Sequence, residues 1–165
     1  MKLLNFGERN KEKKLKNYII ENKNSFYKIA YKYVNNKQDA LDIVQESILK
    51  SLSKIDKLEN IDSIKPWFYT ILINTCIDYT RQSKKYTEIV QKVSSDKYID
   101  RDIEADIDIQ VALDNIPKEY KTVVILRYFQ DMKISDIAKI LDENINTVKT
   151  RLYKALKLLK IEIEE

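Results

Sequence analysis

The chain has 165 residues, of which 44% are hydrophobic and 34% charged, so it is long enough for one domain or two small ones with a heavily charged surface. A net charge of +4 permits a nucleic-acid partner without demanding one. With no histidine and a single cysteine, Cys76, the sequence excludes an internal disulfide, offers no cluster of metal ligands and lacks the commonest general base of enzymes.

The scarcity of chain breakers predicts the fold class. One glycine and two prolines are too few for sheets with tight hairpins, so we expect an all-α protein whose helices are joined by polar turns. No stretch approaches 18 consecutive apolar residues, and the N-terminus lacks the apolar core of a signal peptide. We therefore expect a cytoplasmic protein that is not inserted in a membrane and that binds no metal or other cofactor.

The uneven distribution of charge predicts the domain organisation. Residues 1–24 carry a net charge of +4, whereas residues 86–112 carry −4. We expect two small helical domains, residues 25–85 and 111–165, joined by a flexible acidic linker at 86–110. The basic extension at 1–24 has three open interpretations, which are an extra helix, a contact with the DNA backbone and a disordered arm.

The first domain begins with a helical stripe at 25–36, followed by an amphipathic helix at 39–56 that has two distinct faces. One face is predicted to join the core and consists of Ala40, Ile43, Val44, Ser51, Leu52 and Ile55. The opposite face has the helical spacing i, i+3, i+4, i+7 and consists of Asp42, Gln45, Glu46 and Leu49. Two interpretations of this opposite face stay open, namely a solvated face and a docking surface for a partner helix. Leu49 is unusual in a solvated face.

A second helix is predicted at 66–85, after a polar loop at 57–65, with Pro66 in its first turn. Trp67 and Ile71 share one face and are predicted to lie in the core. The other large apolar residues of this helix cannot all share that face, and they are Phe68, Tyr69, Leu72 and Tyr79. Some aromatic surface should therefore be exposed near the polar and basic residues of the helix, which are Asn74, Asp78, Arg81, Lys84 and Lys85. Such a surface suits unstacked bases of single-stranded nucleic acid, and a two-sided core helix is the alternative.

The second domain contains a predicted helix-turn-helix at 135–154. Ser135 is a good N-cap for its first helix, Ala138 allows a close helix crossing, and Asn146 or Thr147 can cap its second helix. The second helix is predicted to bury Val148, Leu152, Ala155, Leu156 and Leu159, and to expose the cations Lys149, Arg151, Lys154, Lys157 and Lys160. DNA binding in the major groove is favoured over a lysine-rich surface helix. Lys149 and Thr150 are placed to reach base edges.

Both domains resemble one family. DALDIVQESILKSL (39–52) followed by PWFYTILINTCIDYTRQ (66–82) is similar to region 2 of bacterial sigma factors. The stretch 112–159, from ALDNIPKEY to YKALKLL, is similar to their region 4. The two regions in this order, with only a linker between them, resemble the extracytoplasmic-function (ECF) group of the sigma-70 family, which lacks the intervening third domain.

The resemblance implies a non-enzymatic factor that binds core RNA polymerase and directs transcription initiation at specific promoters. It implies that a surface of region 2 docks on the clamp helices of the polymerase, and the matching residues are Asp42, Gln45, Glu46, Leu49 and Leu52. It assigns melting and reading of minus-ten DNA to the loop 57–65 and to Trp67, Tyr69, Asn74, Asp78 and Arg81. Minus-thirty-five DNA is assigned to Thr147, Lys149, Thr150, Arg151 and Lys154. The expected partners are the core polymerase, promoter DNA as duplex and melted strand, and a cognate anti-sigma factor, often membrane-anchored.

The turn of the helix-turn-helix departs from the family's pattern. That turn usually has a glycine followed by an apolar residue, whereas Asp142 and Glu143 stand there in this chain. Aspartate tolerates the left-handed conformation better than most residues, so we expect the turn to be retained with altered packing.

The alternative function is a free-standing, dimeric transcription regulator, which leaves the stripe at 42–49 and the aromatic helix without a role. An enzyme is a distant third, because no nucleophile–base pair or phosphate-binding loop is present.

Overall fold

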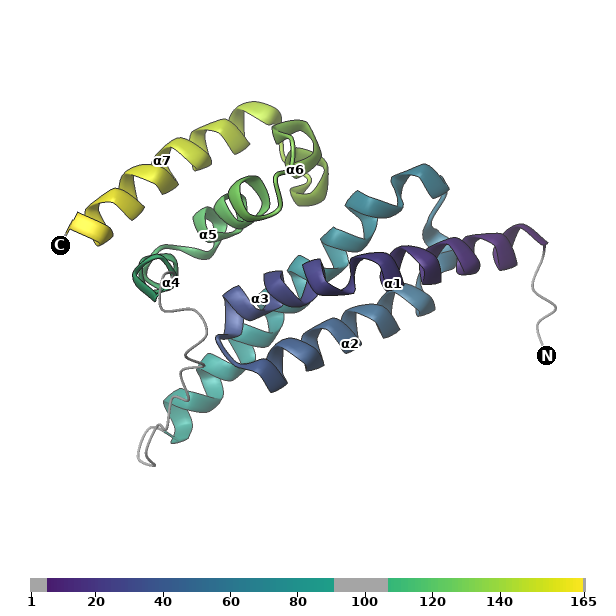
Figure 1. The fold of residues 1–165 in the computed structure, drawn as a ribbon, viewed down its shortest axis with the longest axis horizontal. Helices are drawn as coiled ribbons and strands as arrows, with labels where there is room; N and C mark the ends of the chain where they lie inside the picture. Colours follow the sequence, from purple (N-terminus) through teal and green to yellow (C-terminus); the bar gives the residue numbers. More distant parts are fainter. Residues whose placement is uncertain (1–5, 91–106, 165) are drawn as a thin grey trace. The chain divides into compact units, whose positions relative to one another are not determined.

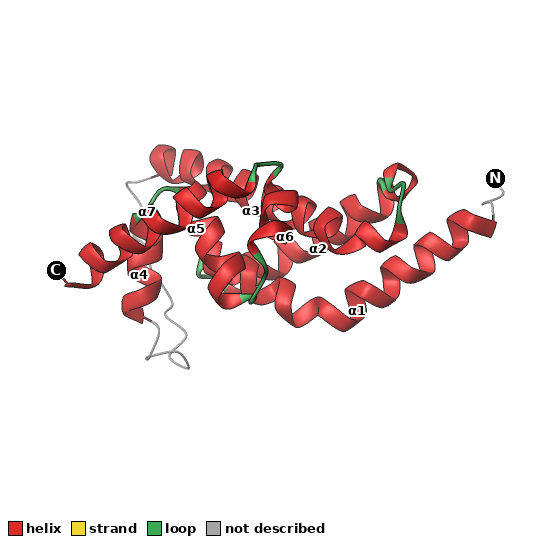
Figure 2. Cartoon of the chain, turned by 90° about the horizontal axis from the view of Figure 1, so that it is seen from above, coloured by secondary structure: helices red, strands yellow, loops and turns green. Residues whose placement is uncertain are grey.

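The structure, a computed structural model, describes residues 6–90 and 107–164 of the chain. Within these ranges the regular elements are all helical, as Figure 2 shows, which confirms the all-α prediction. In chain order they are α1 (Phe6–Val34), α2 (Lys37–Ser53), the short 3-10 turns η1 (Ile55–Lys57) and η2 (Ile61–Ser63), α3 (Ile64–Val90), α4 (Ile107–Asn115), α5 (Lys118–Val124), the π-helical η4 (Ile125–Phe129), α6 (Ile134–Leu141) and α7 (Ile145–Glu164). They form two compact units, residues 1–76 and 77–165, with the division inside α3.

In the first unit, α1 and α2 lie side by side (Figure 1), and the first part of α3 contacts α1 through Phe68 and α2 through Thr75. α1 and α2 are joined by a two-residue turn in which Asn35 adopts the left-handed conformation (φ 53°) and Asn36 caps α2. The side-chain oxygen of Asn36 accepts a hydrogen bond of 2.9 Å from the backbone N–H of Asp39, which satisfies one of the free donors at a helix start.

An aromatic cluster forms the centre of this unit. The rings of Phe26 in α1 and Phe68 in α3 stack with their centroids 4.4 Å apart. Tyr69 meets Phe26 edge-on at 5.5 Å, and Tyr18 lies 5.8 Å from the same ring. Because Phe26, Phe68 and Tyr69 are at most 3% exposed, these contacts hold α1 and α3 together by both apolar burial and ring geometry.

This cluster corrects the predicted orientation of α3. Trp67 and Ile71, which were expected in the core, are only half-buried, whereas Phe68, Tyr69 and Leu72 are fully buried. The helix has two apolar stripes, and its own periodicity does not decide which one meets the neighbouring helix. The stripe containing Phe68 is the buried one because it contacts Phe26 of α1.

The basic extension is part of the first helix. α1 begins at Phe6 and continues without a break through the expected boundary at residue 25. Leu15 and Ile19 are buried, and Lys11 Nζ donates a hydrogen bond of 2.6 Å to the carbonyl of Leu58. Of the three open interpretations, the structure therefore supports an extra helical segment for residues 6–24.

The second unit is built around α7, which packs against α4, α5 and α6. Its core is apolar and includes Leu113, Val123, Leu126, Ile137, Val148 and Ala155. Between α4 and α5, Lys121 Nζ lies 2.9 Å from Asp114 Oδ1, and the lysine side chain is only 8% exposed. Of the linker expected at 86–110, residues 86–90 are helical in α3 and residues 107–110 are helical in α4. Its remaining residues lie outside the described part of the chain.

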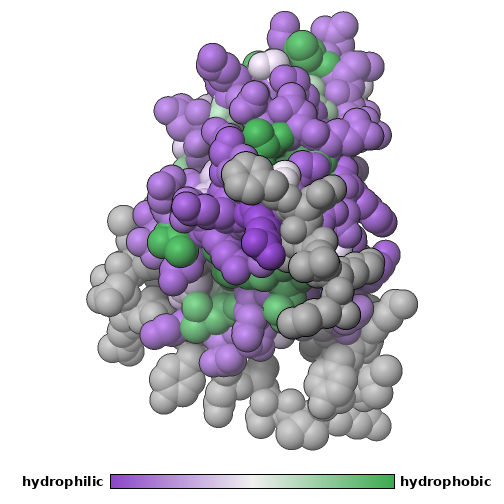
Figure 3. Space-filling view, turned by 90° about the vertical axis from the view of Figure 1, so that its right-hand side faces the viewer, coloured by the Kyte–Doolittle hydropathy of each residue, from purple (hydrophilic) through white to green (hydrophobic). Residues whose placement is uncertain are grey.

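On the face shown in Figure 3, the described residues present a mostly hydrophilic surface with smaller hydrophobic patches. Within the described residues, no helix is both long and apolar enough to cross a membrane. The same residues contain no group of three or more His, Cys, Asp or Glu side chains arranged to hold a metal ion.

Candidate polymerase and nucleic-acid interfaces

The stripe of α2 is exposed as a continuous surface. Asp42, Gln45 and Glu46 are exposed, Leu49 is 61% exposed, and Leu52 at the edge is half-buried. The opposite face of the helix is buried, with Ala40, Ile43, Val44, Ser47 and Ser51 in contact with the rest of the unit. The two predicted faces of this helix are therefore confirmed, except that Leu52 and Ile55 are only partly covered.

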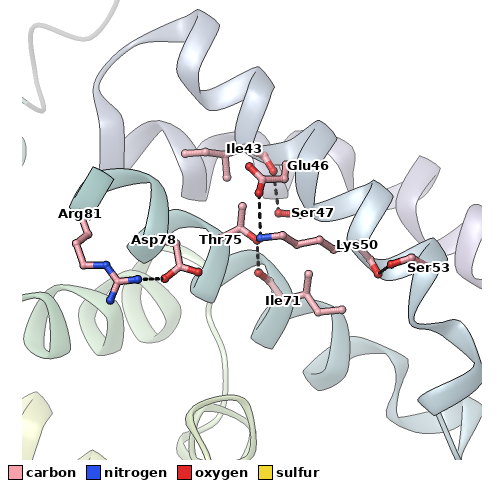
Figure 4. Close-up of polar contacts among 9 residues, drawn as sticks. All are labelled: Ile43, Glu46, Ser47, Lys50, Ser53, Ile71, Thr75, Asp78 and Arg81. Carbon is pink, nitrogen blue, oxygen red and sulfur yellow. Dashed lines mark hydrogen bonds and ion pairs between the residues drawn. The ribbon is translucent and has the colours of Figure 1, made fainter. Parts of the chain in front are cut away.

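Lys50 connects this stripe to α3, a contact that sequence reasoning missed. Its Nζ lies 3.0 Å from Glu46 Oε1 and donates a hydrogen bond of 3.3 Å to Thr75 Oγ1, as Figure 4 shows. The i, i+4 spacing of Glu46 and Lys50 is a sequence signal for the first contact. The second contact requires knowledge of which face of α3 meets α2. Lys50 thus lies between the Glu46 carboxylate of the stripe and the Thr75 hydroxyl of α3.

The polar face of α3 contains four of the five predicted minus-ten residues. Trp67, Asn74, Asp78 and Arg81 have helical spacing that puts them on one face, with Asn74 and Arg81 exposed. Arg81 Nη2 and Asp78 Oδ1 form an ion pair at 2.9 Å, seen in Figure 4. This face combines a half-buried indole with polar and charged groups.

Tyr69, the fifth predicted minus-ten residue, does not belong to this face. Its side chain is 3% exposed and lies within the aromatic cluster. Burial raises the pKa of Tyr69 to about 12, because the phenolate would lose its hydration. Because its ring packs α3 against α1, the position of Tyr69 gives no support to its assignment to minus-ten DNA, which stays a prediction.

The helix-turn-helix is formed by α6 and α7, with the two acidic residues in the turn. Asp142 adopts the left-handed conformation (φ 52°, ψ 48°), as its tolerance of that region predicted. The N–H of Asp142 bonds to the carbonyl of Lys139, and the N–H of Glu143 bonds to that of Ala138 at 3.0 Å. These are the two hydrogen bonds of a Schellman motif, so aspartate does here what glycine does in most helix ends.

The caps of these two helices differ from the predicted ones. α6 begins at Ile134 with Lys133 in the cap position, so Ser135 lies inside the helix. α7 begins at Ile145, and Asn144 rather than Asn146 or Thr147 provides the cap, because its Oδ1 accepts a hydrogen bond of 2.7 Å from the N–H of Thr147. The cap of α6 lies two residues before its predicted place, and that of α7 two or three residues before, slightly more than the usual uncertainty of helix ends.

Most of the predicted minus-thirty-five residues lie at an open groove beside the start of α7. The groove is lined by Thr147, Thr150, Arg151 and Lys154, by Asn144 and Asn146 from the start of the helix, and by Glu119 and Tyr120 of α5. Lys149, Thr150 and Lys154 are exposed. Leu156, which was expected in the core, is 45% exposed on α7.

Arg151 differs from the other cations of this helix. Its Nη2 lies 2.9 Å from Glu143 Oε1, and the two side chains are 26% and 35% exposed. Arg151, which was predicted to be one of five exposed cations, is therefore half-buried and paired with an acid of the turn. This ion pair joins the acidic turn to the basic helix. Helical periodicity does not predict it, because the two residues are eight positions apart and one of them lies in the turn.

Comparison with known proteins agrees with this arrangement. Residues 19–86 match the sequence model of Sigma-70 region 2, and residues 106–159 match that of Sigma-70 region 4. The chain belongs to the sigma-70 family of RNA polymerase sigma factors. It is a sigma factor of the ECF type, with regions 2 and 4 in order, and it directs promoter-specific transcription initiation by core RNA polymerase. The resemblance seen in the sequence is confirmed.

Curated relatives of this sigma factor carry corresponding names. It is 48% identical to RNA polymerase sigma factor SigV of Bacillus subtilis over 152 residues, which cover 88% of each chain. It is 26% identical to the ECF RNA polymerase sigma factor SigW of the same organism, over 87% of this chain and 85% of SigW. These relatives match this chain over most of their own length.

Two solved structures share the fold. The sigma factor RpoE from Bartonella quintana, in complex with the anti-sigma factor NepR, matches 90% of this sigma factor and 96% of its own chain, with a TM-score of 0.68 and 23% identity. CnrH, in complex with the cytosolic domain of CnrY, matches 91% of this sigma factor and 87% of its own chain, with a TM-score of 0.70 and 15% identity. At these identities the similarity establishes the fold.

Proposed function

We propose that this sigma factor docks on core RNA polymerase through the exposed stripe of α2, reads minus-ten DNA with α3 and reads minus-thirty-five DNA with α7. The observation that carries the proposal is the presence of regions 2 and 4 in order, each with an exposed polar surface at the positions that the family resemblance assigns. A free-standing regulator needs only the helix-turn-helix, and it leaves the presence of region 2 before region 4 without a purpose.

The α2 stripe has the chemistry of a docking surface. Leu49 is the most exposed large apolar side chain of α2, and it lies among Asp42, Gln45 and Glu46. An apolar side chain in the middle of a polar rim is the usual composition of a protein interface. The Glu46 carboxylate is exposed beside Lys50 and offers an acceptor to a basic partner surface.

The polar face of α3 suits melted DNA. Trp67 offers aromatic surface on which a base can stack, and Asn74 offers both donors and acceptors to base edges. Arg81 carries a charge for the backbone, although in the free protein it is paired with Asp78. Extrusion of a base from the duplex costs a few kcal/mol, which pocket contacts with such residues offset.

The exposed face of α7 suits duplex DNA. Lys149 and Thr150 lie near the start of the helix, where residues of a recognition helix reach base edges in the major groove. Lys154, one turn further, is exposed and reaches phosphates or bases. Thr147 lines the adjoining groove.

We also propose that the chain is a non-catalytic factor of the cytoplasm, controlled by an anti-sigma factor. Support comes from the two structures of similar fold, since RpoE is in complex with the anti-sigma factor NepR and CnrH with the cytosolic domain of CnrY. A membrane-anchored anti-sigma factor would hold the sigma factor at the membrane through that partner alone.

Run-off transcription with purified core polymerase tests the proposal. Promoter fragments are first selected by the reconstituted holoenzyme from a genomic fragment library, and transcripts from selected fragments are then compared with and without the sigma factor. We expect transcripts of defined start only when the sigma factor is present. A chain that neither binds core polymerase nor starts transcripts, yet binds duplex DNA tightly alone, would be the regulator instead.

A further inference from the structure

The ion pair between Glu143 and Arg151 places an acid beside a helix proposed to bind a polyanion. Glu143 Oε1 and Arg151 Nη2 are 2.9 Å apart, and both side chains are mostly covered, with 35% and 26% exposed. A pair that is partly shielded from solvent is screened less by salt than one on the open surface. The pair therefore persists under the salt conditions in which DNA is bound.

Glu143 is anchored on both sides by backbone geometry. Its own N–H bonds to the carbonyl of Ala138 at 3.0 Å as part of the helix end, and the next residue, Asn144, caps α7. The preceding Asp142 is fixed in the left-handed conformation. Because this backbone is constrained, the Glu143 carboxylate restricts the movement of the Arg151 guanidinium more than it follows that movement.

Arg151 keeps unused hydrogen-bonding capacity in this arrangement. A guanidinium has five N–H donors in a planar fork, and the contact with Glu143 uses one of them. Arg151 also lines the groove formed with Thr147, Thr150 and Lys154, which is where DNA is expected. An arginine held in this way loses less conformational entropy when it makes a directional contact.

We propose that Glu143 is a positioning residue that holds Arg151 in this groove and thereby sets the ratio of sequence-specific to non-specific DNA binding. This inference rests on the proposed reading of duplex DNA by α7. Glu143 offsets the charge of Arg151, so the arginine adds little to sequence-independent attraction by phosphates. The fixed direction of its remaining donors favours contact with a base edge over the many phosphates that a freely moving side chain reaches.

The test compares three variants of the full chain. Glu143→Gln removes the charge of the pair, and Glu143→Asp keeps the charge but shortens the side chain. Asp142→Asn is the matched control, since it removes a neighbouring acid, suits the left-handed conformation, and lies outside the ion pair. Each variant is also made with Arg151→Gln, and thermal unfolding checks that each remains folded.

The probes are duplex DNA selected by the wild-type chain from a library with a randomised 12-base-pair window, and a duplex of the same composition in shuffled order. Affinity for both is measured over a series of salt concentrations. For Glu143→Gln we expect tighter binding to the shuffled duplex, a salt dependence steeper by about one phosphate contact, and a specificity ratio lower by roughly tenfold. For Glu143→Asp we expect the ratio to fall while the salt dependence stays near that of the wild-type chain.

Asp142→Asn should tighten binding to both duplexes alike and leave the ratio unchanged. With Arg151→Gln present, Glu143→Gln should behave like Asp142→Asn. Equal responses of Glu143→Gln and Asp142→Asn in the wild-type background would overturn the inference alone. Failure of the wild-type chain to enrich any sequence would overturn both the proposed reading by α7 and the inference that rests on it.

Discussion

At the scale of single residues, the buried hydroxyl of Tyr18 lowers the free energy of unfolding, because it loses its hydration without gaining a hydrogen bond. Among the described residues, this hydroxyl is the one buried side-chain oxygen or nitrogen that has no hydrogen-bond partner. Its ring packs against Phe26 and Phe68, with centroids 5.8 and 6.1 Å away. Tyr18→Phe keeps these contacts and removes the unsatisfied group, so we expect the free energy of unfolding in urea to be unchanged or higher by about 1 kcal/mol.

The same variant should change the dependence of stability on alkaline pH. Burial, reinforced by the nearby Tyr69, raises the pKa of Tyr18 above its usual value near 10. A raised pKa in the folded state means that stability is fully present below about pH 10 and falls as the pH rises further, because the unfolded tyrosine releases its proton first. Tyr18→Phe should make this fall shallower, with Tyr128→Phe at an exposed position as control. A fall as steep as that of the wild-type protein would contradict the account.

At the scale of elements, the helix ends explain how a chain with one glycine makes its turns. Asn35 after α1, Asp131 after η4 and Asp142 after α6 all have φ near 53°, where glycine is usual. Asparagine and aspartate are the other residues that adopt this region readily. Helices in the described part of the chain therefore end in left-handed turns without glycine, and the end of α6 at Asp142 has the hydrogen bonds of a Schellman motif.

The stripe of α2 should be separable from the stability of its helix. Asp42→Arg with Glu46→Arg reverses two exposed charges without touching the buried face, so we expect loss of binding to core polymerase with cooperative unfolding retained. The measurement is co-purification with core polymerase and its affinity by fluorescence anisotropy. Glu21→Arg with Asp56→Arg makes the same change in net charge at exposed positions off the stripe and should leave affinity nearly unchanged. Equal losses from the two pairs would show a general charge effect and not a docking site.

The ion pair between α4 and α5 should matter for stability. Asp114→Asn removes the negative charge that lies 2.9 Å from the buried ammonium of Lys121, so we expect a loss of about 2 kcal/mol, below the value for a fully buried pair because the aspartate is 37% exposed. Lys121→Met removes the buried charge itself and should cost less. Urea unfolding of both variants decides the order, and a larger loss for Lys121→Met would contradict this explanation.

At the scale of the whole molecule, the sequence predicted element types and the two-region order well, and contacts between elements poorly. Helical periodicity identified the exposed stripe of α2, and motif order identified the family. The buried face of α3 was mispredicted because Phe26, which selects it, lies about 40 residues earlier in the chain. The pair Glu143–Arg151 was missed for the same reason, since it spans a turn whose geometry no periodic pattern contains.

The two regions should fail in different ways when their DNA contacts are removed. Lys149→Ala in α7 removes a contact proposed for duplex DNA and should weaken attachment, a bimolecular step, so more holoenzyme should restore run-off transcription from a selected promoter. Asn74→Ala in α3 removes an exposed contact proposed for melted DNA, so its defect should persist at saturating holoenzyme. A template with a premelted, mismatched minus-ten segment should then rescue Asn74→Ala and leave Lys149→Ala impaired. If both variants respond alike to concentration and to premelting, promoter attachment and opening are not divided between α7 and α3.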